Sequence, residues 1–574
     1  MIVPHTRTRL LLVAATIVAG ILAGGVVDRV IVGGPAWHEL DDRNAPRGVA
    51  LPLHAAVAFS VIGLLITVKA APIMLALARR TTHPYGTEEF MTITRRSLLT
   101  YAALAPAMSA MPRLARAVEQ ATTEKPDYTL RIATGLVELA PDHIVSTALY
   151  NGQFPGSLLR FKEGQRVTVD VYNDTDTPEL VHWHGQMIPS DVDGASEEGT
   201  PFVLPHGMRR VSFVPKPSGF RFYHTHVAAG GDLNRGTYTG LAGPVYIEPK
   251  NNPGTYDREI FLVMKEFAPS LSRGGDMAMD FLAGEPLKEL QRIGKQADDE
   301  AKEKSKGFEV GYERFAINGK MLGSGEPIRI KQGERVLFHV LNASAGEIRS
   351  LALPGHSFRV VALDGNPVPT PVQVPALWLG TAERISAIVH MNRPGVWIMG
   401  DLDNDDRRHG MGVVVEYAGQ KGKAQWAKPR PFQWDYTQFG KIDARSTQSD
   451  ETIEMLIVKN NAALNGFNQW TLNGEAFSMA SMKPAYSLRQ GRRYRLKFRN
   501  ASDDIHPLHL HRHSFELTRI AGKSTSGVIK DVVMLGGFQE LEFDFVADNP
   551  GLTLFHCHQQ LHMDFGFMAL FKYA

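Results

Sequence analysis

The sequence predicts an all-β protein of three consecutive β-sandwich domains, preceded by N-terminal transmembrane helices. From about Asp127 onward, short β-rich runs alternate with Gly, Pro, Asn and Asp, as in β-sandwiches. One sequence element recurs three times over this part of the chain, which indicates three related units. Before them stand two apolar runs of the length that crosses a bilayer.

The composition is that of an ordinary globular protein with an unusual pair of counts. The chain has 574 residues, enough for three or four domains of roughly 150 residues each. Lys and Arg number 62 against 60 Asp and Glu, so the strong basic excess of a nucleic-acid binder is missing. There are 21 histidines but one cysteine, which excludes an intramolecular disulfide framework, a four-cysteine zinc site and a cysteine-ligated iron–sulfur cluster.

Residues 1–90 form the predicted membrane segment, with helices at about 10–27 and 51–76. The first run reads LLLVAATIVAGILAGGVV, 18 residues without a charge. A buried core helix is the alternative for either run. Basic residues precede the first run and follow the second, so the positive-inside tendency places everything after residue 117 outside the cytoplasm.

Residues 91–117 resemble a twin-arginine export signal, and they form a third hydrophobic segment. Arg95 and Arg96 precede a modest apolar run, and Ala115-Arg116-Ala117 offers a small-residue cleavage site. We therefore expect a cell-envelope protein with its later domains in the periplasm, anchored in the inner membrane if residues 1–90 are retained. Translation from Met91 instead of Met1 is the alternative, and the sequence leaves cleavage after Ala117 open.

Two repeated elements mark the domains. In the first, an asparagine lies nine residues after a glycine, and the copies are 169 and 158 residues apart. These pairs are Gly164 and Asn173, Gly333 and Asn342, and Gly491 and Asn500. The second element, around Gly219, Gly395 and Gly551, is followed by histidines five and seven residues later in the first and last units, but by Gly400 and Leu402 in the middle unit. The predicted domains are 127–250, 257–420 and 430–574, and the middle one keeps the frame without the histidines.

One segment does not fit this pattern. Residues 286–306 are charged, with Leu287, Leu290 and Ile293 at helical spacing. We expect a solvated amphipathic helix inserted in the second domain; a lid or docking element is the alternative.

Ten of the 21 histidines fall in four clusters. The clusters are His182-Trp183-His184, His224-Thr225-His226, His506-Pro507-Leu508-His509-Leu510-His511, and His556-Cys557-His558 with His562. On a strand, residues i and i+2 share a face and residue i+1 takes the other. This parity sorts the clusters into a set of eight histidines and a set of His506, Cys557 and His562.

The two sets have different chemistry. Two histidines with one cysteine are the ligand set of a blue-copper electron-transfer site. Eight converging imidazoles suit a multinuclear copper cluster, whereas zinc needs four ligands. Because Cys557 is joined to His556 and His558 through the backbone, the two sites would be wired together over a few covalent bonds.

At these residues the chain resembles three-domain multicopper oxidases of the laccase and bacterial copper-oxidase type. The four motifs, in family order, span His182 to His562, and the repeats cover about residues 127–574. The resemblance implies cupredoxin-like Greek-key domains and four copper ions. It implies type 2 ligands His182 and His509; type 3 ligands His184, His224, His226, His511, His556 and His558; and type 1 ligands His506, Cys557 and His562.

The resemblance also implies roles for two further positions. Asp193 matches an acidic residue near the trinuclear site, where a carboxylate can orient water and relay protons; a plain turn aspartate before Gly194 is the alternative. The axial position of type 1 copper falls on Phe567, which would not coordinate the metal and would raise its potential. A one-residue shift that brings in Met568 is the alternative there.

The family's chemistry is four one-electron oxidations at type 1 copper coupled to reduction of O2 to two waters. The partners are therefore O2 and a reducing substrate, with no nucleic acid. Phenols or aromatic amines are favoured, because no long Met-rich insert of the cuprous-ion oxidases is present. Oxidation of Fe(II), Cu(I) or Mn(II), in copper resistance or metal homeostasis, is the alternative, with Asp503, Asp504 and Asp564 as candidates for a docking site. The sequence leaves the oligomeric state open.

Overall fold

The protein is described here by a computed structural model that covers residues 125–250, 255–273, 280–301, 305–441 and 448–574. The predicted helices at 10–27 and 51–76 and the predicted signal at 91–117 lie outside the described residues. Within the described ranges, no helix has the length and apolarity needed to cross a bilayer. Thr123–Ala574 form one compact unit.

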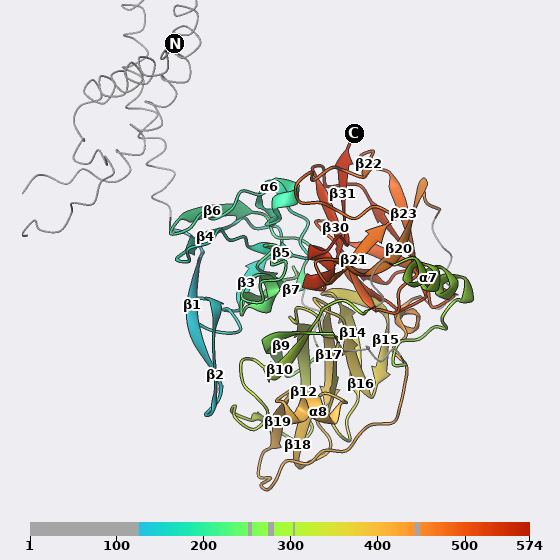
Figure 1. The fold of residues 1–574 in the computed structure, drawn as a ribbon. Coiled ribbons are helices and arrows are strands. Elements are labelled where there is room, and N and C mark those ends of the chain that lie inside the picture. Colours follow the sequence, from blue (N-terminus) through green and yellow to red (C-terminus); the bar gives the residue numbers. More distant parts are fainter. Residues whose placement is uncertain (1–124, 251–254, 274–279, 302–304, 442–447) are drawn as a thin grey trace, which may run out of the picture. The chain divides into compact units, whose positions relative to one another are not determined.

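Three pairs of β-sheets follow one another along this unit (Figure 1). In the first pair, the strand orders are β2-β1-β4-β6 and β3-β8-β7-β5. These strands are β1 (Tyr128–Ala140), β2 (His143–Tyr150), β3 (Leu159–Lys162), β4 (Val167–Asn173), β5 (His182–His184), β6 (Met208–Phe213), β7 (Gly219–His224) and β8 (Ala242–Glu248). Leu130 and Val169 from one sheet and Val245 and Ile247 from the other share one buried core, so the two sheets form a sandwich.

The second pair has the orders β10-β9-β12-β17-β14-β15 and β11-β19-β18-β13-β16. These strands are β9 (Arg258–Ser272), β10 (Glu309–Ile317), β11 (Ile328–Ile330), β12 (Arg335–Asn342), β13 (Arg349–Ala352), β14 (Phe358–Leu363), β15 (Asn366–Val374), β16 (Ala376–Leu379), β17 (Arg384–His390), β18 (Val396–Gly400) and β19 (Gly412–Tyr417). Val336, Phe338 and Val340 alternate along β12 and are fully buried in the core of this sandwich.

The third pair has the orders β21-β20-β23-β29-β25-β26, with β27 beside β25, and β22-β31-β30-β24-β28. These strands are β20 (Glu451–Leu464), β21 (Phe467–Leu472), β22 (Tyr486–Leu488), β23 (Arg493–Asn500), β24 (His506–Leu510), β25 (Phe515–Ile520), β26 (Lys523–Ser524), β27 (Ile529–Lys530), β28 (Val532–Leu535), β29 (Glu540–Val546), β30 (Thr553–Cys557) and β31 (Met568–Tyr573). The core of this sandwich is continuous with that of the second. The all-β prediction is therefore confirmed for the described residues.

The repeated glycine–asparagine element has a structural reason. Each glycine has a positive φ in the turn before a strand, and each asparagine ends that strand with a fully buried side chain. Asn342 shows the pattern: its Nδ2 donates to Glu347 O at 2.8 Å and Leu379 O at 2.9 Å, and its Oδ1 accepts the Ser344 N–H at 3.1 Å. Asn173 and Asn500 make the same three kinds of hydrogen bond. One amide thus ties three loop segments together in every domain.

The helices are few. They are α6 (Ser190–Asp193), α7 (Lys288–Glu300), α8 (Asn404–Arg408) and α9 (Gln560–Asp564), with short 3-10 turns at Ser196–Glu198, Gly236–Tyr238 and Tyr436–Phe439. The predicted amphipathic helix is α7. It buries Leu290 and pairs Glu289 with Arg499 at 2.8 Å, so it packs on the third domain although it is inserted in the second.

Candidate metal centres

The first and third domains each place two histidine-bearing strands side by side. In the first, β5 pairs with β7 and His182 stands opposite His224. In the third, β24 pairs with β30 and His509 stands opposite His556. Because cross-strand partners lie on the same face of a sheet, each pair presents its imidazoles on one side. The corresponding strand of the middle domain, β18, ends at Gly400.

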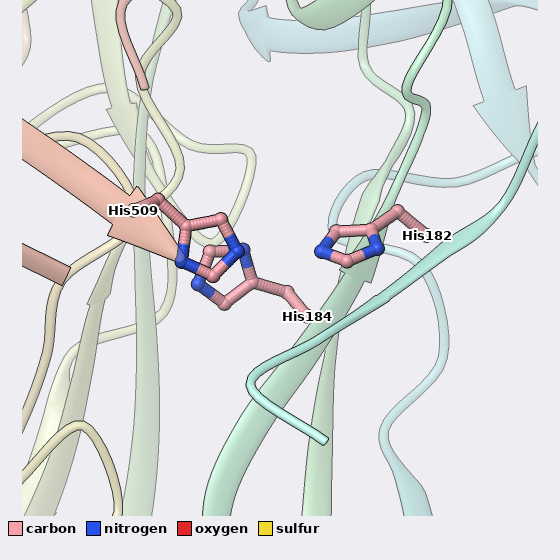
Figure 2. Close-up of side chains that lie close together, drawn as sticks. All are labelled: His182, His184 and His509. Carbon is pink, nitrogen blue, oxygen red and sulfur yellow. The ribbon is translucent and has the colours of Figure 1, made fainter. Parts of the chain in front are cut away.

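Eight histidines from these two domains converge into what we call the histidine cluster. They form three groups in which the candidate ligand atoms lie within 4.8 Å of one another. The groups are His182, His184 and His509; His184, His224 and His558; and His226, His511 and His556. Each group therefore takes ligands from both domains. Figure 2 shows the first, in which His184 and His509 stack with ring centroids 3.9 Å apart and His182 stands beside them.

Six of these histidines have one ring nitrogen held by an oxygen of the protein. The Nδ1 atoms of His182, His224, His509 and His556 lie 2.9, 2.7, 2.7 and 2.8 Å from the carbonyl oxygens of Asp193, Thr225, Asp531 and Cys557. His511 Nδ1 lies 2.9 Å from Asp193 Oδ2, and His184 Nε2 lies 3.1 Å from Asp531 Oδ1. Such an outer hydrogen bond fixes the tautomer and leaves the other nitrogen unprotonated for a metal.

The inner nitrogens have the surroundings that metal ligands require. His182 Nε2, His184 Nδ1, His224 Nε2 and His509 Nε2 are buried without a hydrogen-bond partner in the described structure. His511 Nε2 and His556 Nε2 face each other at 3.0 Å. Two unprotonated nitrogens at that distance repel each other unless a cation lies between them. The donor set therefore fits metal ions, and imidazole nitrogens are good ligands for copper.

Burial keeps seven histidines of the cluster neutral. Removal from water lowers the pKa well below its ordinary value, and the neighbouring imidazoles lower it further. This holds for His184, His224, His226, His509, His511, His556 and His558. Neutral imidazoles have lone pairs ready for a metal, so no protons need to be displaced at neutral pH.

Two buried aspartates orient the histidine cluster. Asp193, at the end of α6, contacts His182 Nδ1 through both its carbonyl oxygen and Oδ2, at 2.9 and 3.1 Å, and His511 through Oδ2. Asp531 does the same for the other two central histidines, with its carbonyl at His509 and its carboxylate at His184. The sequence singled out Asp193. It gave no signal for Asp531, which stands 347 positions from His184 and near no histidine motif.

A glycine brings Asp193 into place. Gly194 follows it with φ 106°, and a Cβ there would lie 2.0 Å from the Val181 carbonyl oxygen. Only glycine lets the chain pass this close to β5. The sequence allowed Asp193 to be a plain turn residue before Gly194. This turn is present, and it places Asp193 in contact with His182.

His506, Cys557 and His562 form a second buried set, which we call the cysteine group. Cys557 Sγ lies 3.7 Å from His506 Nδ1 and 3.6 Å from His562 Nδ1, and the two Nδ1 atoms are 3.1 Å apart. Burial raises the pKa of the Cys557 thiol well above its ordinary value, so the thiolate forms only against a bound cation. Two histidines and a thiolate around one point are the equatorial ligands of a blue-copper site.

Phe567, which precedes β31, and Met568, which begins it, pack in different apolar clusters. Phe567 packs in the same apolar cluster as Cys557, and its ring centroid lies 4.8 Å from that of His506. Met568 packs in a different cluster with Leu554. The side chain near the cysteine group is therefore Phe567, and Met568 points away from it.

Two more side chains support the cysteine group, and sequence reasoning missed both. Ser502 Oγ lies 2.9 Å from His506 Nε2, which leaves His506 Nδ1 toward the sulfur. The Trp470 indole stacks on the His562 ring at 3.9 Å between centroids and 30° between planes. Neither residue carries a motif: Trp470 lies on β21 and meets His562 only through the fold.

The three acidic residues considered for metal docking do not come together. Asp503 and Asp504 both form ion pairs with Lys459, the latter at 3.2 Å. Asp564 Oδ2 instead accepts the backbone N–H groups of Ala229 and Gly230 at 2.8 and 2.7 Å. None of the three belongs to a metal-holding group found among the described residues.

Comparison with known proteins gives a consistent result. Three family models, each described as multicopper oxidase, match residues 133–252, 291–415 and 447–574. The multicopper oxidase MmcO of Mycobacterium tuberculosis is 29% identical over 480 residues, covering 82% of this chain and 90% of the relative. Laccase-3 of Thanatephorus cucumeris is 24% identical over 561 residues, covering 78% and 91%. In fold, the chain is similar to Fet3p, a multicopper oxidase that functions in iron import, with a TM-score of 0.62 at 16% identity, covering 78% and 90%.

Proposed function

The chain belongs to the multicopper oxidase family, and from this premise we propose that it is a laccase-like oxidase of phenols or aromatic amines. As a member of this family it is a copper-dependent oxidoreductase that uses O2 as electron acceptor. Its four copper ions supply the one-electron oxidation of substrate and the four-electron reduction of O2 to water. The substrate proposal rests on the sequence, which has no long Met-rich insert, and on the ion pairs that Asp503 and Asp504 form with Lys459.

The copper ligands follow from the two sets of side chains. We assign the cysteine group to type 1 copper, with Phe567 as a non-coordinating axial neighbour. The type 2 ligands are His182 and His509. The type 3 ligands are His184, His224 and His558 on one side and His226, His511 and His556 on the other. This assignment is supported by the mutual distances and by the unpaired inner nitrogens.

Electrons can pass from the cysteine group to the histidine cluster along one short piece of backbone. Cys557 is covalently joined to His556 and His558, which belong to two different groups of the cluster. His556 Nδ1 also donates a hydrogen bond to the Cys557 carbonyl oxygen at 2.8 Å. We propose that β30 carries the electrons by these bonds.

Protons for the reduction of O2 come from buried carboxyl groups beside the cluster. Asp193 Oδ1 is buried without a hydrogen-bond partner in the described structure. Burial and the Asp193 charge raise the pKa of Glu198 well above its ordinary value, which favours its protonated form. Glu198 Oε1 lies 3.7 Å from His511 Nδ1. Asp193 and Glu198 would then relay protons toward the histidine cluster.

The substrate proposal depends on what faces the cysteine group. An acidic docking site for Fe(II) needs free carboxylates, and Asp503 and Asp504 both form ion pairs with Lys459. Trp470 is fully buried against His562, so it supports this ligand and does not itself meet the substrate. Oxidation of a metal ion is therefore the outcome that the test below must exclude.

Kinetics on one copper-loaded sample test the proposal. We expect oxidation of 2,6-dimethoxyphenol with O2 uptake, and kcat/KM for Fe(II) at least tenfold lower. The variants Asp503→Asn and Asp504→Asn should leave the Fe(II) rate unchanged. Failure to oxidise the phenol, together with fast Fe(II) oxidation that these variants abolish, would establish the metal-ion oxidase instead.

We also propose a location in the cell envelope, anchored in the inner membrane if residues 1–90 remain attached. The proposal rests on the apolar runs and the paired arginines of the N-terminal sequence. Mass spectrometry of the mature N-terminus tests it. A start near Val118 indicates a free periplasmic enzyme, a start near Met1 indicates a tethered one, and recovery from the cytoplasm contradicts both.

A further inference from the structure

Asp531, which orients two histidines of the cluster, is hydrogen-bonded to residues of the middle domain. Arg384 on β17 donates Nη1 to Asp531 Oδ1 at 2.7 Å and Nη2 to Asp531 Oδ2 at 2.6 Å. Both side chains are fully buried. This two-pronged pairing fixes the plane of the carboxylate as well as its position.

The middle domain also holds the backbone at this point. Asp364 Oδ2 accepts the N–H groups of Asp531 at 3.2 Å and Val532 at 3.1 Å, and Asp364 Oδ1 accepts the backbone N–H of Arg384 at 3.0 Å. The carbonyl of Asp531, which faces His509, is therefore fixed by Asp364, and its carboxylate, which faces His184, is fixed by Arg384.

The charges of this buried assembly balance. Arg221 of the first domain adds an Nη1 contact of 3.4 Å to Asp531 Oδ2. Lys530 Nζ lies 2.9 Å from Asp364 and 3.0 Å from Glu383. Three cations thus face three carboxylates, so no buried charge is left uncompensated. The assembly draws on all three domains and meets at Asp531.

We propose that Arg384 is a positioning residue for the trinuclear copper site. Arg384 binds both carboxylate oxygens of Asp531 and so fixes the position of Oδ1. In that position Oδ1 accepts a hydrogen bond from the Nε2–H of His184. His184 is then held in the tautomer that turns Nδ1 inward, where Nδ1 is buried and unpaired. The domain that has no copper ligands thereby sets the geometry of copper ligands in the other two. The inference rests on the proposed assignment of His184 to type 3 copper.

A merely structural ion pair would behave differently. It would change how tightly the domains hold together, but it would change the two kinds of copper site equally. Arg349 offers the matched control: it is a buried arginine of the same domain, paired with Asp406 at 2.6 Å, and it has no contact with Asp531 among the hydrogen bonds and ion pairs of the described residues. Replacing Arg349 removes the same kind of group without touching the cluster.

The test compares Arg384→Met, Arg384→Lys and Arg349→Met with the parent chain after copper loading. The readouts are bound copper per chain, copper affinity by chelator competition, the blue thiolate absorption of type 1 copper, and the near-ultraviolet absorption of type 3 copper. For Arg384→Met we expect an affinity of the trinuclear site about 10- to 100-fold weaker and a reduced near-ultraviolet band, with the blue band intact. Arg384→Lys, which keeps the charge but not the fork, should fall in between.

The outcomes separate the inference from the proposed function. A parent chain without the near-ultraviolet band contradicts the assignment of the cluster itself. If the parent chain shows the band and Arg384→Met keeps as much of it as Arg349→Met does, the role of Arg384 is overturned. The assignment of the cluster to copper is not affected by that result. If Arg384→Met does not fold, Arg384→Lys decides: equal losses of the blue and near-ultraviolet bands overturn the proposal, and selective loss of the latter supports it.

Discussion

At the scale of single residues, the metal centres are defined by which nitrogen of each imidazole is already occupied. Oxygens of Asp193, Asp531, Thr225 and Cys557 accept a hydrogen bond from one nitrogen of each of six histidines and leave the other nitrogen facing inward. These partners are mostly backbone carbonyls, which any residue could provide. The ligand types were therefore readable from the sequence, and the orientation of each ring was not.

The first prediction concerns the sulfur. Cys557→Ser should abolish the blue absorption and substrate turnover, because serine offers no thiolate and the electron path starts at this atom. Bound copper should fall by one ion per chain while the near-ultraviolet type 3 absorption persists. Absorption spectra and copper analysis of the purified variant check this. Retained oxidation of the phenol would contradict the electron route through β30.

A second prediction uses the two neighbours at the axial position. Phe567→Met should lower the reduction potential of type 1 copper, because a thioether sulfur can donate electron density that a phenyl ring cannot. Met568→Leu is the matched control, since Met568 packs away from the cysteine group. Redox titration of the blue band measures both. A shift in the control and none in Phe567→Met would show that Met568 is the axial neighbour.

At the scale of elements, the alternation of side chains along strands explains how much of the site was predictable. The His-x-His spacing predicted which imidazoles come together. β5 contains a complete pair, whereas β7, β24 and β30 each end at, or one residue after, the first histidine of a pair. Asp531, Trp470 and Ser502 were not predictable, because their partners lie far away in sequence and are met only through strand pairing. The charged segment was correctly expected to be a helix, but its packing on β20 could not be read from a single amphipathic stripe.

The third prediction concerns α7. Leu290 is its fully buried side chain, whereas Leu287 at its start is 41% exposed. Leu290→Ala should weaken the docking of the helix by about 2 kcal/mol, the low end for such a truncation, and so raise the rate of proteolysis within α7 roughly 30-fold. Leu287→Ala is the control and should cleave at the parent rate. Limited proteolysis with mass mapping measures this, and equal rates in both variants would show that Leu290 does not anchor the helix.

At the scale of the whole molecule, the three domains divide the work unevenly. The first and third supply the candidate ligands, and the middle one supplies buried charged groups that reach Asp531. An apolar cluster also joins all three: Phe220, Ala382 and Val532 lie in it together. The middle domain is therefore part of the site although it carries none of the ligands, which its sequence, with Gly400 in place of a histidine, did not indicate.

The fourth prediction is a pH dependence of the copper-free protein. Burial lowers the pKa of His506 to about 4 and that of seven histidines of the cluster well below normal. The unfolded chain, with ordinary histidines near pH 6.5, then binds more protons than the folded one, so stability falls as the pH drops below about 6.5. Below pH 6.5, each of these histidines lowers the free energy of unfolding by about 1.4 kcal/mol per pH unit, until the pH reaches its pKa in the folded protein.

Urea denaturation of the copper-free protein at pH 8, 7, 6 and 5 measures this dependence. The midpoint should fall only slightly between pH 8 and 7 and should fall steeply below pH 6.5. Copper should raise the midpoint most at the higher pH, because protons and copper compete for the same nitrogens. A midpoint that stays level down to pH 5 would mean that the imidazoles are not buried in the neutral form.

The convergence of histidines from two domains has a consequence for how the chain is held together. With one cysteine, the protein can form no disulfide within the chain. His226 and His556 are 330 positions apart, and a metal ion held by both closes that loop as a covalent bridge would. In a chain-entropy model, closing a loop of this length removes unfolded-state freedom worth roughly 5 to 6 kcal/mol. The bound metal would thus also act as a cross-link between the first and third domains.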